Sequence, residues 1–317
     1  MSEDTDLLID DRWIMSCRGR KNPVDPQKPY GWLVEKEYTK AGKTEDTGII
    51  FLTNHECSFH CLMCDLWKNT TDGPVPAGAI PNQIEWALEQ MPGIKHLKLY
   101  NSGSFFDTRA IPREDYKRIA SLLSSFDSVI VESHPRLIND KCLIFRNMLK
   151  PELQIAIGLE IANPEILRKL NKQMTMEDFR NAVSFLTDHG ILSRAFILLR
   201  PPFMSESEGI YWAERSIDFA FSAGAECCTV IPVRSGNGAM DQLKARGYFD
   251  MPDIHSLETV VEYGLGLNAG RVFADVWDLG LFSGCKKCVD KRTRRLIEMN
   301  FGQKIIDKVK CTCVSSG

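Results

Sequence analysis

The stretch TNHECSFHCLMCDLWKN, residues 53–69, places three cysteines within eight positions. Cys57, Cys61 and Cys64 have the spacing C-x3-C-x2-C and follow the β-branched run GIIFLTN at 48–54. Such thiols can form a disulfide, bind zinc beside a histidine, act as a nucleophile or hold an iron–sulfur cluster. Structural zinc sites usually pair two C-x2-C units, which this spacing does not provide. Three thiolates on a four-iron cube leave one iron open for a small molecule, so the spacing favours a cluster.

Outward from this loop, apolar β-branched runs alternate with helical patterns. Strands are predicted at 48–54, 96–103, 128–133, 153–160, 194–200 and 227–233. Helices are predicted at 81–91, 113–126, 138–149, 163–170, 175–190 and 205–224. Such alternation is typical of a parallel sheet with crossover helices. Polar residues follow the carboxyl end of nearly every strand, which favours a partial (β/α)6 TIM-like barrel over residues 46–268 rather than an open doubly wound sheet.

Both ends of the chain are expected to lie outside this barrel. Residues 1–45 mix Arg, Lys, Pro and Gly, and they predict an irregular N-terminal lead-in. Residues 269–317 predict a small Cys-rich C-terminal module that packs on the barrel, with a strand at 271–279 and a helix inside 288–300.

The C-terminal module holds a second group of cysteines, a C-x2-C pair followed by a C-x-C pair. Its members are Cys285, Cys288, Cys311 and Cys313. Four thiols complete a tetrahedral zinc site, or they hold an auxiliary iron–sulfur cluster; four unrelated free cysteines are the alternative. Lysines and arginines crowd residues 286–295 beside them and form either a solvated face or a patch for an anionic partner.

Composition narrows the class of protein. The 317 residues carry a net charge of −3, so no global basic field exists for nucleic acid. The acidic start MSEDTDLLIDDRW does not resemble a signal peptide, and no apolar run approaches the roughly 20 residues of a membrane helix. We therefore expect a cytoplasmic protein that binds no membrane. Its 11 cysteines then indicate metal or catalysis rather than disulfides.

The loop at Cys57, Cys61 and Cys64, placed after the first strand of such an alternation, resembles the signature of the radical S-adenosylmethionine (SAM) enzymes. The resemblance implies that the cysteines hold a 4Fe-4S cluster whose open iron chelates SAM. It also implies that the reduced cluster cleaves SAM to a 5′-deoxyadenosyl radical, which abstracts hydrogen from a substrate. A flavodoxin- or ferredoxin-type protein is the implied electron donor.

The run IGLEIANPEILRKLNKQMT at 157–175 resembles the Elongator-type branch of that superfamily. With NSGSF at 101–105, RPPF at 200–203 and the closing cysteine pairs, the pattern is similar to the archaeosine-biosynthesis radical SAM family over about residues 48–313. The resemblance implies SAM-binding roles for Met63, Asn101, Ser102, Gly103, Ser104, Glu132 and Glu160. A structural ion pair is the alternative role for Glu160.

Further polar and aromatic residues at the predicted mouth of the barrel are candidates for substrate contact. They are His134, Arg200, Arg234, Asn237, Asp275 and Trp277. Two arginines among them suggest an anionic group on the substrate, because a guanidinium matches a carboxylate or a phosphate. The alternative is that Arg200 and Arg234 pair with acidic neighbours in the chain.

In the resembled family a partner loads lysine onto a deazaguanine base of tRNA, and the radical enzyme then cleaves that lysine. The first hypothesis is therefore a radical SAM lyase or transferase in tRNA base modification, with tRNA or a partner protein bound. The low positive charge instead favours a small-molecule substrate, an amino-acid or nucleoside-like metabolite. A third hypothesis is a non-catalytic iron–sulfur or zinc sensor.

Overall fold

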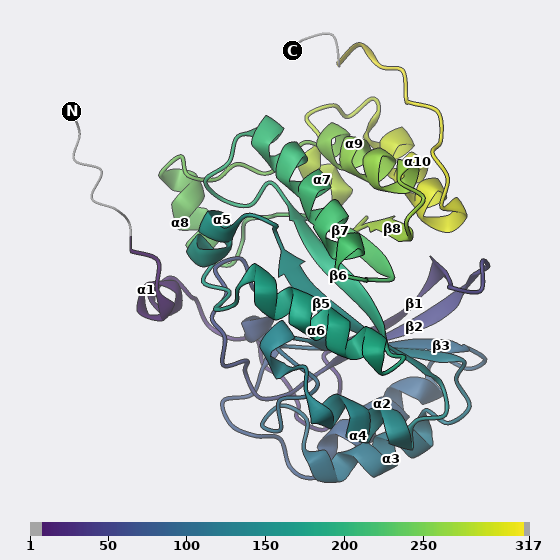
Figure 1. Ribbon diagram of the computed structural model, residues 1–317. Coiled ribbons are helices and arrows are strands. Elements are labelled where there is room, and N and C mark those ends of the chain that lie inside the picture. Colours follow the sequence, from purple (N-terminus) through teal and green to yellow (C-terminus); the bar gives the residue numbers. More distant parts are fainter. Residues whose placement is uncertain (1–7, 314–317) are drawn as a thin grey trace.

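The computed structural model describes residues 8–313, and its centre is one curved sheet whose eight strands lie side by side in chain order (Figure 1). The strands are β1 (Gly31–Tyr38), β2 (Thr44–Leu52), β3 (His96–Asn101), β4 (Ser128–Ser133), β5 (Glu152–Glu160), β6 (Leu192–Leu199), β7 (Cys227–Pro232) and β8 (Arg271–Ala274). The β1–β2 pair is antiparallel, and each later pair is parallel. The prediction of a partial barrel of parallel strands is confirmed.

Helices connect the parallel strands and cover the outer face of the sheet (Figure 1). The α-helices are α1 (Asp11–Ser16), α2 (Ala79–Glu89), α3 (Tyr116–Leu122), α4 (Asp140–Met148), α5 (Pro164–Lys169), α6 (Met176–Asp188), α7 (Glu206–Ser222), α8 (Ala239–Ala245), α9 (Ile254–Gly266) and α10 (Val289–Gly302). Short 3-10 helices are η1 (Leu66–Asn69), η2 (Arg113–Asp115), η3 (Pro135–Leu137) and η4 (Leu279–Phe282). Their apolar faces and the outward side chains of the strands form the hydrophobic core.

Local sequence signals fix several of these elements where they were predicted. The strand β4 occupies 128–133 as expected. The helix α6 begins after Thr175, whose hydroxyl accepts a hydrogen bond from the amide of Asp178, while the Asp178 carboxylate accepts one from the amide of Thr175. This reciprocal capping satisfies two amides that the first helical turn leaves free.

Residues 1–45, predicted to be irregular, contain the helix α1 and the strand β1. The strand directs Glu35 and Glu37 into the barrel, where they pair with Lys98 at 2.6 Å and with Arg194 at 2.6 Å respectively. Acidic residues on the inward face hid the usual alternation of a strand, because that signal assumes an apolar inner face. The helices α8 and α9 were also missed, and β8 ends at Ala274 rather than at 279.

The free edge of β8 is covered by side chains of the C-terminal helix. The Asn300 amide donates to the carbonyl of Ala274 and accepts from its backbone N–H, at 2.9 and 2.8 Å. The Gln303 amide makes the same pair of bonds with Val272 at 3.0 and 2.8 Å. These two amides replace the missing neighbouring strand, so α10 closes the barrel on this side.

Within residues 8–313, the helices are all too short or too polar to cross a membrane.

Candidate functional site

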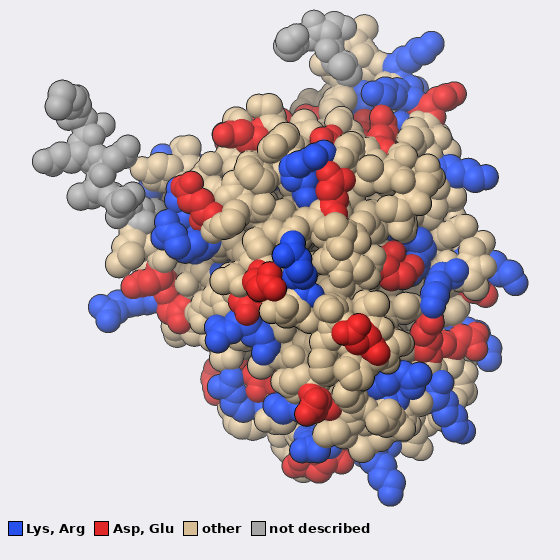
Figure 2. All heavy atoms as spheres, in the orientation of Figure 1, with Lys and Arg blue, Asp and Glu red and all other residues tan. Residues whose placement is uncertain are grey.

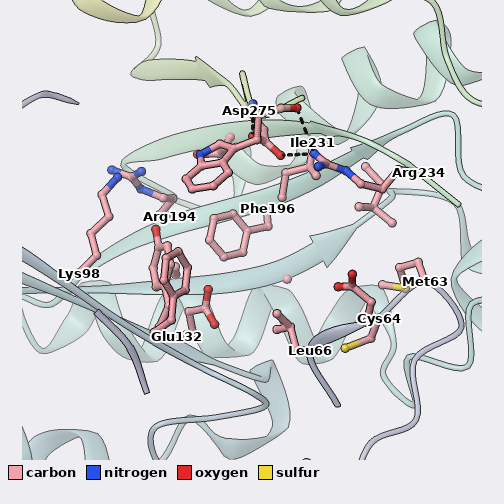
Figure 3. Close-up of a pocket in the computed structure, with 18 of the residues that line it drawn as sticks. Met63, Cys64, Leu66, Lys98, Glu132, Arg194, Phe196, Ile231, Arg234 and Asp275 are labelled. Carbon is pink, nitrogen blue, oxygen red and sulfur yellow. Dashed lines mark hydrogen bonds and ion pairs between the residues drawn. The ribbon is translucent and has the colours of Figure 1, made fainter. Parts of the chain in front are cut away.

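A cavity of about 870 Å³ occupies the inside of the partial barrel. Figure 3 shows Met63 and Cys64 at one end of it and Lys98 and Arg194 at the other, with Glu132 and Phe196 between them. Side chains from β1 to β8, the cysteine loop and α10 line the wall. The volume is in the range of small-molecule sites, and the cysteine loop lies at the carboxyl ends of the strands, where parallel sheets place their ligands.

Three asparagines hold the backbone of the cysteine loop. The Nδ2 of Asn54 donates to the carbonyl of His55 at 2.7 Å, and the Nδ2 of Asn171 donates to the carbonyl of His60 at 2.8 Å. The Nδ2 of Asn237 donates to the carbonyls of Leu62 and Cys64 at 2.8 and 3.1 Å. The loop has little regular structure of its own, so these amides, which come from segments after β2, α5 and β7, fix its path. Asn237, predicted to contact substrate, thus also positions the loop.

The three thiols of this loop are enclosed by protein. Burial raises the pKa of Cys57 to about 11 and the pKa of Cys61 and Cys64 to about 12. Thiolates at these positions therefore require a positive partner such as a metal. Gly103, at φ 105°, packs against Cys57: a Cβ at Gly103 would lie 2.9 Å from the Cys57 sulfur. The glycine of the predicted NSGSF loop is needed for this close approach.

Glu160 and Lys172 form a buried pair beside the thiols. Their Oε1 and Nζ atoms are 2.5 Å apart, and both residues line the cavity. Burial opposes the charged ammonium, but Glu160 and the Cys61 thiol beside it raise the pKa of Lys172. Glu160 has φ 65° at a bulge in β5, a conformation that turns its side chain toward Lys172. The structural ion pair expected as the alternative for Glu160 is present.

Sequence reasoning missed Lys172. A lysine in the segment NKQMT between α5 and α6 carried no signal of burial, because lysine is rarely buried unless paired. Its approach to Cys57 and Cys61 arises only when the segment after α5 packs against the cysteine loop, where the amide of Leu62 donates to the carbonyl of Leu170. Its neighbours in the sequence, Asn171 and Gln173, are polar and gave no sign of a buried position.

Glu132 on β4 lines the cavity and has no ion pair within residues 8–313. Burial raises the pKa of Glu132 to about 8. A hydrogen bond from the amide of Asn101 is too weak to offset that cost. The side chain is a neutral acid near pH 7, and it becomes a strong acceptor once a donor enters the cavity.

The other predicted SAM-binding residues divide into two groups. Met63 and Gly103 line the cavity. Asn101, Ser102 and Ser104 are buried behind it, each about 1% exposed. The hydroxyls of Ser104 and Ser133 are hydrogen-bonded at 2.8 Å, whereas the Asn101 Oδ1 and the Ser102 Oγ have no partner within the described chain.

His134, predicted to contact substrate, packs against the cysteine loop. Its ring stacks on Phe59 of the loop with 3.8 Å between centroids and 8° between planes. The Nε2 donates to the carbonyl of Lys172 at 2.9 Å, and the Nδ1 accepts from the amide of Arg136 at 3.2 Å. Burial lowers the pKa of His134 to about 3, so the imidazole is neutral. Both ring nitrogens of His134 are engaged in hydrogen bonds within the chain, so the ring lines the cavity without a free polar atom.

The predicted substrate arginines are both paired. Arg200 does not line the cavity; it donates to Glu206 at 2.7 Å and to the carbonyl of Met251 at 2.9 Å. Arg234 does line the cavity and lies 3.1 Å from Asp275 and 3.4 Å from Asp278 (Figure 3). The alternative expectation, pairing with acidic neighbours, holds for both arginines.

An aromatic row crosses the cavity from Asp275 toward β6. Trp277 meets Phe51 edge-on at 6.5 Å, Phe51 neighbours Tyr100 at 6.3 Å, and Tyr100 meets Phe196 edge-on at 6.4 Å. Trp277 is 47% exposed, so the row reaches the opening of the cavity. We call these four residues the aromatic row. Only Trp277 among them was predicted, because an aromatic residue inside a strand usually belongs to the core.

The end of the cavity opposite the cysteine loop is closed by an ion network. Glu37 lies 2.6 Å from Arg194 and 2.5 Å from Lys98, and Arg194 also stacks on Phe273. Burial opposes ionisation, yet the two cations hold the pKa of Glu37 well below its usual range. The sequence analysis did not predict this network, because Glu37 lies on β1, a strand that was not predicted either.

The four C-terminal cysteines come together as predicted. Their sulfurs all lie within 4.8 Å of one another. The sulfurs of Cys285 and Cys311 are 3.8 Å apart, and those of Cys288 and Cys313 are 3.5 Å apart. The Nε of Arg292 donates to the Cys288 sulfur at 3.3 Å. Backbone amides lower the pKa of Cys285, and they lower the pKa of Cys311 to about 7, whereas the hydrogen bond with Cys311 raises the pKa of Cys313 to about 12.

The chain is similar to an uncharacterised protein and to subunits of archaeosine synthase. No family model matches the chain. An uncharacterised protein of Methanocaldococcus jannaschii is 32% identical over 237 residues, which cover 70% of this chain and 65% of that protein. The archaeosine synthase subunit beta of Thermococcus kodakarensis is 29% identical over 166 residues, or 50% of this chain and 51% of the relative. The chain thus spans about half to two thirds of the length of these relatives.

Among solved structures, the archaeal Elp3 of Methanocaldococcus infernus superposes with a TM-score of 0.50. The match covers 70% of this chain and 58% of Elp3 at 15% identity. At that identity the likeness shows a shared fold.

Proposed function

Because the chain belongs to the Elongator-like, archaeosine-related part of the radical SAM superfamily, we propose that it is a radical SAM enzyme whose Cys57, Cys61 and Cys64 hold a 4Fe-4S cluster. The observation that carries this proposal is the fixed loop that holds three thiols, Cys61 buried and Cys57 and Cys64 half-buried, at one end of a cavity of about 870 Å³. When bound and reduced, the cluster supplies the electron that cleaves SAM to a 5′-deoxyadenosyl radical.

The residues present fit this group. Three thiols without a fourth leave an iron for SAM, and enclosure by protein suits a cluster that must react away from water. The sulfurs of the loop do not form a compact group of the kind made by the C-terminal cysteines. Thiolates on one zinc ion cannot lie farther apart than about 4.6 Å, twice the Zn–S distance, so the open arrangement favours a larger cluster.

The chain's own residues would then bind and orient SAM. We assign Lys172 to the carboxylate of SAM, because it is the buried cation nearest to the thiols, and Glu160 keeps it charged. We assign Glu132 to the hydroxyl or amino donors of SAM, since it is a cavity carboxylate without an ion-pair partner. Met63 and Gly103 form the wall against which the nucleoside packs. The aromatic row and Asp275 remain for substrate at the opening.

For the substrate we propose a modified base in tRNA, processed together with a partner protein. The name of the Thermococcus relative, a subunit of archaeosine synthase, supports this choice. The net charge of −3 supports a second candidate, an amino-acid or nucleoside-like metabolite that needs no RNA contact. A flavodoxin- or ferredoxin-type donor is proposed as the source of the electron.

The test of the proposed function is SAM cleavage. Anaerobically reconstituted protein with dithionite and SAM is expected to release 5′-deoxyadenosine, measured by chromatography with mass detection. Protein kept free of iron is the control and is expected to release none. Reconstituted protein that binds iron but releases no 5′-deoxyadenosine would identify a sensor instead of an enzyme.

We further propose that Cys285, Cys288, Cys311 and Cys313 bind one zinc ion. Four thiolates around zinc at about 2.3 Å are separated by about 3.8 Å, close to the 3.5 and 3.8 Å observed. A four-iron cube places each thiolate on a different iron and needs wider spacing. Its role is structural: one pair immediately precedes α10 and the other lies in the segment after it, so the ion ties that later segment back to the N-terminal end of the helix.

Metal analysis can check this zinc site separately from the cluster. A variant with alanine at Cys57, Cys61 and Cys64 is expected to retain about one zinc per chain and little iron. Adding Cys311→Ala and Cys313→Ala should remove the zinc and lower the melting temperature, because α10 then loses its anchor. Four iron atoms in the first variant, or no metal, would contradict the assignment.

A further inference from the structure

The C-terminal segment has a charge opposite to that of the rest of the chain. Residues 284–313 contain nine lysines and arginines and three acidic residues, a net charge of +6, whereas the whole chain carries −3. The remainder is therefore at −9. Such asymmetry between parts of a chain indicates that the basic part meets a polyanion.

The structure separates structural from free cations in this segment. Arg292 and Arg295 are about 2–3% exposed and pair with Glu258 of α9. The remaining cations are exposed, and six of them have no ion pair within residues 8–313: Lys286, Lys287, Lys291, Arg294, Lys304 and Lys310. Figure 2 shows lysine and arginine side chains near the C-terminal end of the described chain, with acidic side chains among them. We call these six residues the basic face.

The helix α10 carries two residues of the basic face, Lys291 and Arg294, and part of the cavity wall. Lys291 and Arg294 are spaced i and i+3, so they lie on one side of the helix, and Lys287 comes two residues before its first residue, Val289. Ile297, Asn300 and Phe301 of the same segment line the cavity. A chain of phosphates along the basic face would thus lie within about one helix diameter, 10–12 Å, of the cavity. A nucleotide turned out of that strand can reach the opening.

At the opening, the aromatic row offers what a nucleobase requires. Aromatic side chains stack on unpaired bases of RNA, and Trp277 is exposed at the mouth. Arg234 beside it pairs with Asp275 and Asp278, and the guanidinium N–H groups left over from those pairs can donate to a base edge. An acidic protein would use the basic face but would have no use for this row.

We propose that the basic face of the C-terminal module binds the phosphate backbone of RNA and presents one nucleotide to the cavity. The inference rests on the proposed function and names the surface by which its substrate binds. The zinc site gives that surface its shape, because it fixes the segments before and after α10 to each other. The overall negative charge is then compatible with RNA, since the contacts are confined to one module.

The test measures RNA binding without turnover, so it does not depend on SAM cleavage. Reconstituted full-length protein is titrated into a labelled tRNA transcript, and anisotropy is followed between low and moderate salt. The test variant replaces Lys291, Arg294 and Lys304 with glutamine; these residues lie apart from the metal-binding cysteines. The matched control replaces the exposed Lys117, Lys150 and Lys244 with glutamine. Zinc content and melting temperature verify that both variants are folded.

The wild type is expected to bind with a steep salt dependence. Each phosphate contact contributes about 0.7–0.9 to the slope of log affinity against log salt, so the test variant should lose about 2–3 in slope and at least tenfold in affinity at low salt. The control should remain within about twofold of wild type. Equal losses in both variants, no loss in the test variant, or no RNA binding by wild type at low salt would each overturn the proposal; the last would leave an acidic protein as the partner. Failure of SAM cleavage with intact RNA binding would overturn the proposed function alone.

Discussion

Alanine at any one of Cys57, Cys61 or Cys64 is expected to abolish both the cluster and SAM cleavage. Each thiol is enclosed, and burial raises the pKa of each to about 11 or 12, so a thiolate persists only when iron stabilises it. Loss of one ligand from a three-ligand site leaves a second open iron. The brown absorbance and 5′-deoxyadenosine release should both fall below detection.

Cys17→Ala is the matched control. Cys17 is half-buried near the same end of the molecule, and its carbonyl packs against Gly238, but its sulfur is not part of the loop. This variant should keep its iron and at least half of the wild-type rate. A loop variant that retains its iron and continues to turn over SAM would show that the three cysteines are not the cluster ligands.

Parts of the site near parallel strands could be predicted because their signals are local. The spacing of the three cysteines is contained within eight residues, and Glu132 and Asp275 follow apolar runs that identify strands. A residue at the carboxyl end of a parallel strand is then expected to lie at the cavity, and this expectation does not depend on the other elements of the fold. Glu132 and Asp275 do line the cavity.

The missed residues depend on contacts between distant segments. Asn54 and Asn171 donate hydrogen bonds to backbone carbonyls of the loop. The residues next to an asparagine in the sequence do not indicate which carbonyl will accept its hydrogen bond. Lys98 faces inward on β3. A lysine at such a position argues against a buried strand unless its partner, Glu37 on β1, is known. Buried charges are specified in pairs, so a sequence reveals neither member until the pairing of strands is known.

Removal of the buried charge at Glu132 is expected to stabilise the protein at alkaline pH. Burial raises the pKa of Glu132 to about 8, above the ordinary value of 4.5 in the unfolded chain. Between these values the folded state binds a proton that the unfolded state does not, so the free energy of unfolding falls as pH rises. The slope approaches about 1.4 kcal/mol per pH unit and levels off above pH 8. Glu132→Gln has no such proton and should escape the loss.

Urea unfolding of both proteins between pH 5 and pH 9 measures this difference, with iron and SAM absent so that ligands do not contribute. The advantage of Glu132→Gln over wild type should grow by about 2–4 kcal/mol from pH 5 to pH 8, the lower figure applying if cavity water reaches the carboxylate. Glu114→Gln, which removes an exposed carboxylate on η2, is the control and should show no growing advantage. A constant difference between Glu132→Gln and wild type across this range would mean that Glu132 is already ionised in the folded protein. Some cation would then have to reach it, and the nearest buried one, Lys172, would be shared between Glu160 and Glu132 instead of being held by Glu160 alone.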